Sequence, residues 1–216
     1  MVNFGILFIT GIALIIVASL AVAPPTPPLS PTENLHPITV VIDAGDGGRA
    51  PGAVVAGVQE KNINLAIALR VAAVARGDPR LRVVLTRTTD RFIEHRERLR
   101  IAEREQAVLF LSIQTNAAPA TSGRGVETWV DDSRRPTDCS WKLAAAVQQG
   151  VIASTGAVDR GVRSQRLYMR DTHLPSVLLE VGFLTNPTER RLLLTPEYQD
   201  RIARGVVAGI LDFLRL

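Results

Sequence analysis

One carboxylate stands where a folded domain rarely tolerates a charge. Glu180 lies inside the otherwise apolar run Ser-Val-Leu-Leu-Glu-Val-Gly-Phe of residues 176–183. Burying a carboxylate in a strand is costly unless the group is paired or belongs to a site. The position therefore predicts either an ion pair with one of the chain's arginines or a site for acid-base chemistry.

Further polar side chains follow other predicted strands. Asp46 lies in a glycine-rich turn after residues 38–42, and Gln114 and Asn116 follow residues 108–113. Glu60 stands at the start of a predicted helix, where an acidic residue also stabilises the helix dipole. In parallel α/β sheets, ligands bind beyond the carboxyl ends of the strands, so we expect these side chains to gather at one edge.

Strands and helices alternate along residues 38–216. Short apolar, β-branched runs predict strands, and apolar positions at helical spacing predict helices. The predicted strands are residues 38–42, 81–86, 108–113, 126–130, 166–169 and 176–181, and the predicted helices are residues 62–76, 91–106, 140–154 and 197–214. This alternation is typical of a three-layer α/β domain with a mainly parallel central sheet of about six strands and helices on both faces, here preceded by an N-terminal hydrophobic helix.

The N-terminal residues differ in character from this domain. Residues 1–32 carry no charged side chain, and residues 4–23 are almost continuously apolar, about the length of a membrane-crossing helix. Ala21-Val22-Ala23 has the form of a signal-peptidase site, yet no Lys or Arg precedes the apolar run. We expect residues 1–23 to be a signal peptide or a membrane anchor and residues 24–37 to be a proline-rich tether.

Composition narrows the classes of function. The 216 residues carry 25 Lys and Arg against 21 Asp and Glu, a net charge of +4, and 5% of them are aromatic. The basic excess suits anionic partners in general, but no nucleic-acid-binding motif is present, so we expect no nucleic acid partner. A single cysteine, Cys139, excludes an internal disulfide and a Cys-rich zinc cluster.

Segments from residue 38 to residue 214 resemble, in order and spacing, the zinc-dependent N-acetylmuramoyl-L-alanine amidases (amidase type 3). These are peptidoglycan hydrolases with a single α/β catalytic domain, which here corresponds to residues 38–216. The matching segments are VVIDAGDGG, PGAV, QEKNINL, VVLTRTTD, LFLSIQTNAA, GVETWV, DRGV, LPSVLLEVGFLTNPTERRLL and PEYQDRIARGVVAGI.

The resemblance implies cleavage of the amide between N-acetylmuramic acid and the L-alanine of the stem peptide. Family members hold one zinc ion with His, Glu and His, and a second glutamate takes a proton from the attacking water. This mapping makes Glu180 the general base and Glu60 a metal ligand. Asp46 and Gln114 stand at the two histidine positions. We therefore expect zinc to bind weakly, to be replaced by another divalent metal, or to be absent.

Substrate contacts and partners follow from the same resemblance. Asn116, Arg166 and Arg170 are expected to line the cleft and to meet carboxylates of the stem peptide. The expected protein is an exported monomer that acts on peptidoglycan outside the cytoplasmic membrane, in the periplasm or cell wall, with residues 1–23 as its membrane contact. A second interpretation stays open because both histidines are missing: a catalytically inactive relative that binds peptidoglycan or regulates a true hydrolase.

Overall fold

The computed structural model describes Met1 and residues 36–215. The expected signal peptide or anchor, the N-terminal hydrophobic helix and nearly all of the expected tether lie outside the described residues. Among the residues that are described, no helix is both long and apolar enough to cross a bilayer.

A six-stranded sheet forms the centre of residues 36–215. Its strands are β1 (Ile38–Ala44), β4 (Leu81–Leu85), β5 (Phe110–Asn116), β6 (Val126–Asp131), β7 (Asp159–Gln165) and β8 (Ser176–Phe183), in the spatial order β4-β1-β5-β8-β6-β7. The first four strands in that order are parallel to one another, β6 runs antiparallel to β8, and β7 runs parallel to β6. The carboxyl end of β8 therefore lies at the same end of the sheet as the first residues of β6 and β7. Two short strands, β2 (Val54–Val55) and β3 (Val58–Gln59), pair separately.

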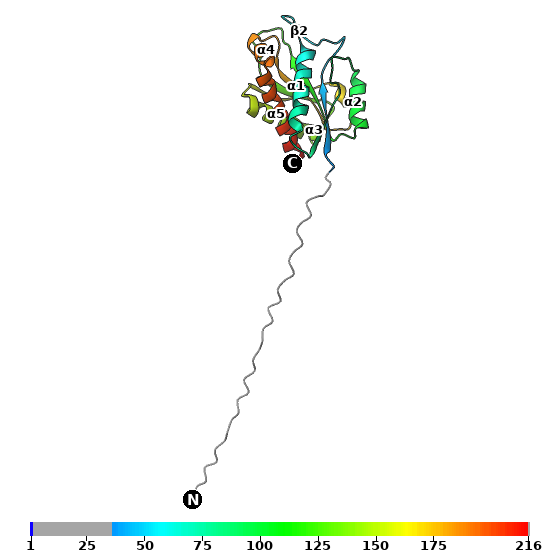
Figure 1. Ribbon diagram of the computed structural model, residues 1–216, viewed down its shortest axis with the longest axis vertical. Coiled ribbons are helices and arrows are strands. Elements are labelled where there is room, and N and C mark those ends of the chain that lie inside the picture. The colour runs from blue at the N-terminus through cyan, green and yellow to red at the C-terminus, as the bar shows by residue number, and fades with distance from the viewer. Residues whose placement is uncertain (2–35, 216) are drawn as a thin grey trace. The chain divides into compact units, whose positions relative to one another are not determined.

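Helices pack on both faces of the sheet (Figure 1). One face carries α1 (Glu60–Ala75), α3 (Cys139–Thr155) and α5 (Pro196–Leu214), and α4 (Pro187–Leu193) precedes α5. Within residues 36–215, the other face carries only the short α2 (His95–Arg104) and the 3-10 helix η1 (Tyr168–Asp171). The prediction of a mainly parallel, six-stranded α/β sheet with helices packed on it is confirmed.

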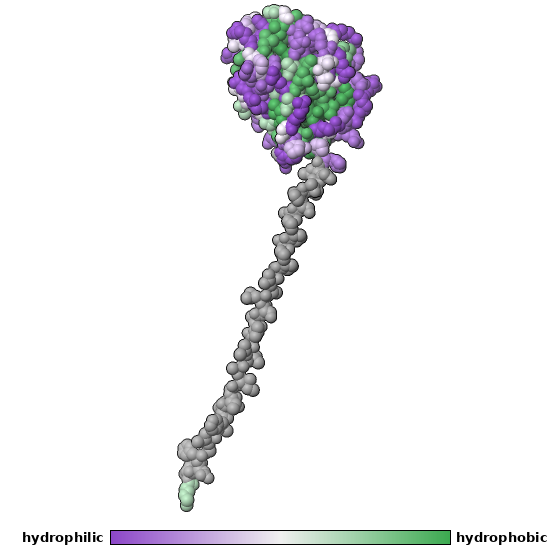
Figure 2. Space-filling model, in the orientation of Figure 1, coloured by the Kyte–Doolittle hydropathy of each residue, from purple (hydrophilic) through white to green (hydrophobic). Residues whose placement is uncertain are grey.

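The two faces differ in how they are filled. Strand residues alternate between them, so Val40 and Ile42 pack under α1 whereas Val41 packs under α2. The three-helix face holds the larger apolar cluster. On the outside, Figure 2 shows hydrophilic residues around smaller hydrophobic areas. The thinly covered second face leaves room for polar side chains.

Two segments differ from the prediction. Residues 166–169, predicted as a strand, instead follow β7 and enter η1. β7 is an edge strand with a mostly polar, solvent-facing sequence, so it lacks the apolar alternation that identifies strands. Leu167 and Met169 gave the apolar signal, and they are buried from a non-strand segment. The prediction also missed α4, which Asn186 caps by accepting hydrogen bonds from the backbone N–H groups of residues 188 and 189.

Candidate functional site

A row of polar side chains crosses the sheet on the face that carries α2 and η1. Gln114 of β5 is the register partner of Glu180 of β8, and Glu180 is the register partner of Glu127 of β6. Paired residues point to the same face, so these three side chains are neighbours. They lie toward the carboxyl ends of β5 and β8, at the edge where ligands bind in such sheets.

Glu180 has a buried oxygen without a partner. Among the described residues, its Oε2 atom makes no hydrogen bond. Burial raises the pKa of Glu180 well above its ordinary value, and the negative charges of Glu60, Glu127 and Asp46 raise it further. A carboxylate in this environment takes up a proton readily, which is the property that a general base requires.

Glu60 joins the start of α1 to the edge of the sheet. Its Oε2 accepts a hydrogen bond from the Ala53 backbone N–H at 2.9 Å, and its Oε1 accepts one from the Thr115 N–H at 2.8 Å. Burial raises the pKa of Glu60, while these two hydrogen bonds oppose the rise. The carboxylate is thus fixed in place beside the end of β5.

Asp46 lies in a left-handed turn, with φ of 58°. Arg98 Nη2 donates to the Asp46 carbonyl at 2.7 Å, and Arg87 Nη2 donates to the Gly45 carbonyl at 2.7 Å, so two guanidinium groups hold the turn. The carboxylate of Asp46 faces Glu60. A Cβ at Gly52 would lie 2.5 Å from Asp46 Oδ2 and 2.6 Å from Glu60 Oε2. Only a glycine leaves room for both carboxylates, and burial raises the pKa of Asp46.

Gln114 is held between two side chains. Its Nε2 donates to Ser112 Oγ at 3.2 Å, and its Oε1 accepts from Asn64 Nδ2 at 3.3 Å. The same Asn64 nitrogen lies 3.4 Å from Glu60 Oε1. We call Asp46, Glu60, Gln114 and Glu180 the edge cluster, since hydrogen bonds, strand register and mutual charge connect them.

A buried network beneath the edge cluster is centred on Asp43, which the sequence marks, with Asp46, as a polar residue following the first apolar run. Asp43 Oδ1 accepts hydrogen bonds from Arg98 Nη1 and Thr86 Oγ1, each at 2.6 Å. Its Oδ2 accepts from Ser112 Oγ at 2.8 Å and from the Tyr168 hydroxyl at 2.9 Å. Asp43 thereby connects Arg98, which bonds the Asp46 carbonyl, with Ser112, which bonds Gln114. The sequence-based prediction missed the partners of Asp43, because Arg98, Ser112 and Tyr168 come from distant segments of the chain.

The donor set of the edge cluster suits a cation that takes oxygen ligands, and does not fit a zinc ion held by imidazoles. Asp46, Glu60 and Gln114 offer two carboxylates and a neutral amide. Within the described part of the chain, no three His, Cys, Asp or Glu side chains are grouped to hold a metal, so Gln114 is needed as the third donor.

One of the three histidines, His95, lies near the edge cluster, since its charge acts to lower the pKa of Asp46, and the other two lie away from it. His95, in α2, stacks on Tyr168 with 4.3 Å between ring centroids. His36 is exposed just before β1, and His173 is exposed between η1 and the start of β8. Both therefore stand at the opposite ends of their strands from Asp46 and Glu180, and neither supplies an imidazole to the edge cluster.

The structure brings Asn116, but not Arg166 or Arg170, to the edge cluster. Asn116 Nδ2 donates to Glu127 Oε1 at 2.7 Å, next to Glu180. Arg166 and Arg170 follow the carboxyl end of β7. Because β6 and β7 run antiparallel to β8, the carboxyl end of β7 lies at the opposite end of the strands from Glu180. Arg170 there pairs with Asp132 at 2.8 Å.

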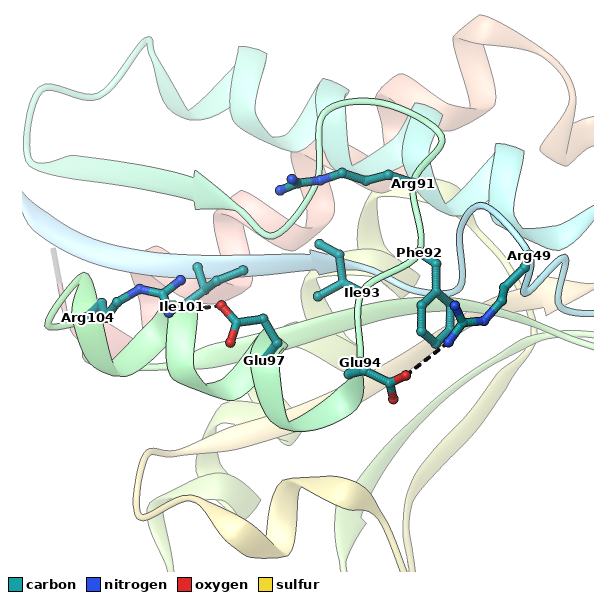
Figure 3. Close-up of a pocket in the computed structure, with 8 residues that line it drawn as sticks. All are labelled: Arg49, Arg91, Phe92, Ile93, Glu94, Glu97, Ile101 and Arg104. Atoms are coloured by element: carbon teal, nitrogen blue, oxygen red, sulfur yellow. Dashed lines mark hydrogen bonds and ion pairs between the residues drawn. The ribbon is translucent and has the colours of Figure 1, made fainter.

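A hollow of about 470 Å³ lies beside the turn that carries Asp46 (Figure 3). Arg49 crosses it to pair with Glu94 at 3.1 Å and stacks on Phe92. The remaining lining residues are Arg91, Ile93, Glu97, Ile101 and Arg104. The hollow contains no residue of the edge cluster, so it is a neighbouring surface feature.

Known proteins match this chain over most of the described domain. A family model for N-acetylmuramoyl-L-alanine amidase matches residues 40–212. N-acetylmuramoyl-L-alanine amidase LytC of Bacillus subtilis (strain 168) is 36% identical over 178 residues, which cover 82% of this chain and 36% of LytC. The chain therefore spans about a third of the length of that relative.

Solved structures agree with this match. The catalytic domain of CwlV, an N-acetylmuramoyl-L-alanine amidase from Bacillus (Paenibacillus) polymyxa var. colistinus, has a TM-score of 0.77 and 38% identity, covering 82% of this chain and 98% of that one. An N-acetylmuramoyl-L-alanine amidase from Clostridium difficile 630 has a TM-score of 0.79 and 33% identity, covering 83% and 97%.

Proposed function

Because the chain belongs to the N-acetylmuramoyl-L-alanine amidase family of cell-wall hydrolases, we propose that it cleaves the amide between N-acetylmuramic acid and L-alanine in peptidoglycan. The observation that carries the proposal is the position of Glu180. One oxygen of its carboxylate, Oε2, is buried without a hydrogen-bond partner among the described residues. The carboxylate lies beside Gln114, at the end of the sheet where ligands bind, and the negative charges of Asp46 and Glu60 act on it. A proton on the Glu180 carboxylate would be in position for transfer to the leaving nitrogen during amide hydrolysis.

Glu180 is the proposed general base. It takes a proton from a water molecule as the water oxygen adds to the carbonyl carbon of the amide. It then delivers that proton to the nitrogen of L-alanine as the carbon–nitrogen bond breaks, so that a carboxylic acid and a free amine result. The raised pKa of Glu180 supports this cycle. It makes the carboxylate a stronger base toward water than an ordinary glutamate, and the protonated group can then donate to the amine nitrogen.

Asp46, Glu60 and Gln114 are the proposed ligands of a divalent cation. Carboxylate and amide oxygens suit magnesium, calcium or manganese better than zinc, so we propose that the family's zinc binds weakly here or is replaced by such a cation. When bound, a divalent cation polarises the amide carbonyl and lowers the pKa of a bound water.

The remaining expectations become part of the proposal. Asn116 is proposed to contact the substrate, since it lies beside Glu127 and Glu180. Peptidoglycan as substrate implies action outside the cytoplasmic membrane, in the periplasm or cell wall. Residues 1–23 are the proposed signal peptide or membrane anchor, residues 24–37 the tether, and residues 38–216 the catalytic domain of a monomer.

The oxygen-only donor set favours a second candidate function. A chain that holds no catalytic metal can still bind peptidoglycan, and it can regulate a true hydrolase by competing for the same substrate. In that case the edge cluster would be a binding surface, and Glu180 would contact the ligand without transferring a proton.

Digestion of purified sacculi separates the two functions. The full chain, supplied in turn with Zn²⁺, Mn²⁺, Mg²⁺ and Ca²⁺, is expected to release stem peptides with a free L-alanine amino terminus. Glu180→Gln should abolish release, whereas Glu197→Gln, at an exposed position on α5, should not. Binding to sacculi without release under any metal would refute hydrolysis and support the second function.

A further inference from the structure

Next to the edge cluster, Arg160 and Arg163 of β7, the outermost strand on that side of the sheet, both contact the buried carboxylate of Glu127. Arg160 Nε lies 2.7 Å from Glu127 Oε2, and Arg163 Nε lies 3.5 Å from the same oxygen. The Glu127 side chain is 3% exposed, whereas those of Arg160 and Arg163 are 31% and 47% exposed. Two guanidinium groups thus face one buried carboxylate, and Arg160 also lies within electrostatic reach of Glu189.

Aromatic rings help to hold both guanidinium groups in place. Arg160 lies over the ring of Phe183 at 4.8 Å from its centroid, and Arg163 lies over Trp129 at 5.8 Å. Arg163 donates from Nε to the Arg160 carbonyl at 3.4 Å, but within residues 36–215 its two terminal nitrogens have no hydrogen-bond acceptor. Such a planar, positioned group is suited to bind a carboxylate.

The arginine pair lies within reach of Glu180. Glu127 is the register partner of Glu180, and neighbouring strands are about 4.8 Å apart. An extended peptide advances by roughly 3.4 Å per residue. A stem peptide whose first amide lies at Glu180 and whose chain runs across β6 toward β7 places the carboxylate of its next residue on the side of the arginine pair.

We propose that Arg160 and Arg163 form a carboxylate-binding subsite that reads the residue following L-alanine in the stem peptide. The subsite favours stem peptides with a free carboxylate at that residue over peptides in which this group is amidated. Arg163 is the specificity-determining residue, because Arg160 alone satisfies Glu127. The proposal rests on the proposed function, since it takes the stem peptide as the ligand.

A purely structural role explains less of the geometry. Arg160 and Asn116 already bond both oxygens of Glu127. Arg163 adds a longer contact from a half-exposed position, and exposed ion pairs contribute little to stability. What Arg163 adds beyond this pairing is a set of free donors facing solvent beside the candidate site.

Two probe ligands that differ only at this group test the proposal. The full chain is titrated calorimetrically with N-acetylmuramoyl-L-alanyl-D-glutamate γ-methylamide and with N-acetylmuramoyl-L-alanyl-D-isoglutamine γ-methylamide. The first carries the free α-carboxylate and the second its amide, while the side-chain carboxyl group is blocked in both, and mass spectrometry checks that the ligands stay intact. We expect the acid to bind about ten-fold more tightly at low salt, with the preference falling as salt rises. Arg163→Gln should remove the preference and leave the affinity for the amidated ligand unchanged.

Arg82→Gln is the matched control, because Arg82 lies on β4, the opposite edge strand, and also pairs with a glutamate, Glu105. This variant should keep the full preference. Equal binding of both ligands to the native chain, or an unchanged preference in Arg163→Gln with the fold intact by circular dichroism, overturns the subsite. Binding of neither ligand overturns the proposed function together with the subsite.

Discussion

Replacing Glu180 with glutamine should stabilise the fold at neutral pH while removing the proposed catalytic group. Glu180 is partly buried, its buried Oε2 has no partner within the described residues, and three other carboxylates raise its pKa. The glutamine amide has nearly the same shape, carries no charge, and has N–H donors for the neighbouring carboxylates. A functional group thus imposes a stability cost that the substitution should relieve.

The sign of the pH dependence follows from the raised pKa. In the unfolded chain Glu180 titrates near its ordinary value of 4.5, whereas in the folded chain it holds its proton to higher pH. Below about pH 4 both states are protonated, so the group opposes folding least there. Above that pH the native protein loses stability relative to Glu180→Gln by at most about 1.4 kcal/mol per pH unit, until the folded group also ionises.

The expected gain at pH 7 is about 1 to 3 kcal/mol, the usual cost of a buried polar group without a partner. For a protein of this size that corresponds to a rise in Tm of roughly 2 to 12 °C. Denaturant unfolding of both proteins between pH 4 and pH 8 measures the difference and its slope.

Glu127→Gln provides a matched comparison at the register partner of Glu180. Glu127 is buried, but it is paired with Arg160 at 2.7 Å. Removing its charge should therefore destabilise the fold, by about 1 to 3 kcal/mol because Arg160 is partly exposed. A loss of stability in Glu180→Gln at pH 7, or a difference that does not change with pH, would refute this reasoning about the site.

Three further substitutions test the packing that positions the site. Gly52→Ala should lower Tm and stability by about 2 kcal/mol or more, because φ is 65° there and a Cβ would meet both neighbouring carboxylates within 2.6 Å. Gly150→Ala should cost about 1 to 3 kcal/mol in urea unfolding, since its Cβ would lie 2.3 Å from the carbonyl oxygen of a facing α5 residue. Gly77→Ala should cost less, because its Cβ would lie 3.3 Å from the nearest heavy atom. Arg98→Ala should cost about 3 to 5 kcal/mol by the same assay, because it leaves the buried Asp43 carboxylate without its charge partner.

Local patterns determined how much of the fold could be predicted. The buried strands β1, β5 and β8 are apolar runs, so their positions were clear from the sequence. Strand direction was not, because it depends on the path between strands. A strand that reverses direction relative to its neighbour looks the same in sequence, and the reversal at β6 moved Arg166 and Arg170 away from Glu180.

The candidate site was predictable only in part for a similar reason. Glu180 stood out because it interrupts an apolar strand, and the resemblance supplied Asp46, Glu60 and Gln114. The partners that fix these groups come from distant segments: Asn64 lies 50 residues before Gln114, and no spacing rule connects them. Such contacts appear only once the fold has brought the segments together.

Zinc binding by the double variant Asp46→His, Gln114→His tests the central claim most directly, that the edge cluster is one site descended from a metal centre. Competition with a chelator should show one zinc per chain, bound about 100- to 10,000-fold more tightly than by the native protein, because each replaced ligand accounts for roughly 3 kcal/mol in zinc sites. Zinc affinity that stays at the native level in a correctly folded double variant would contradict the claim.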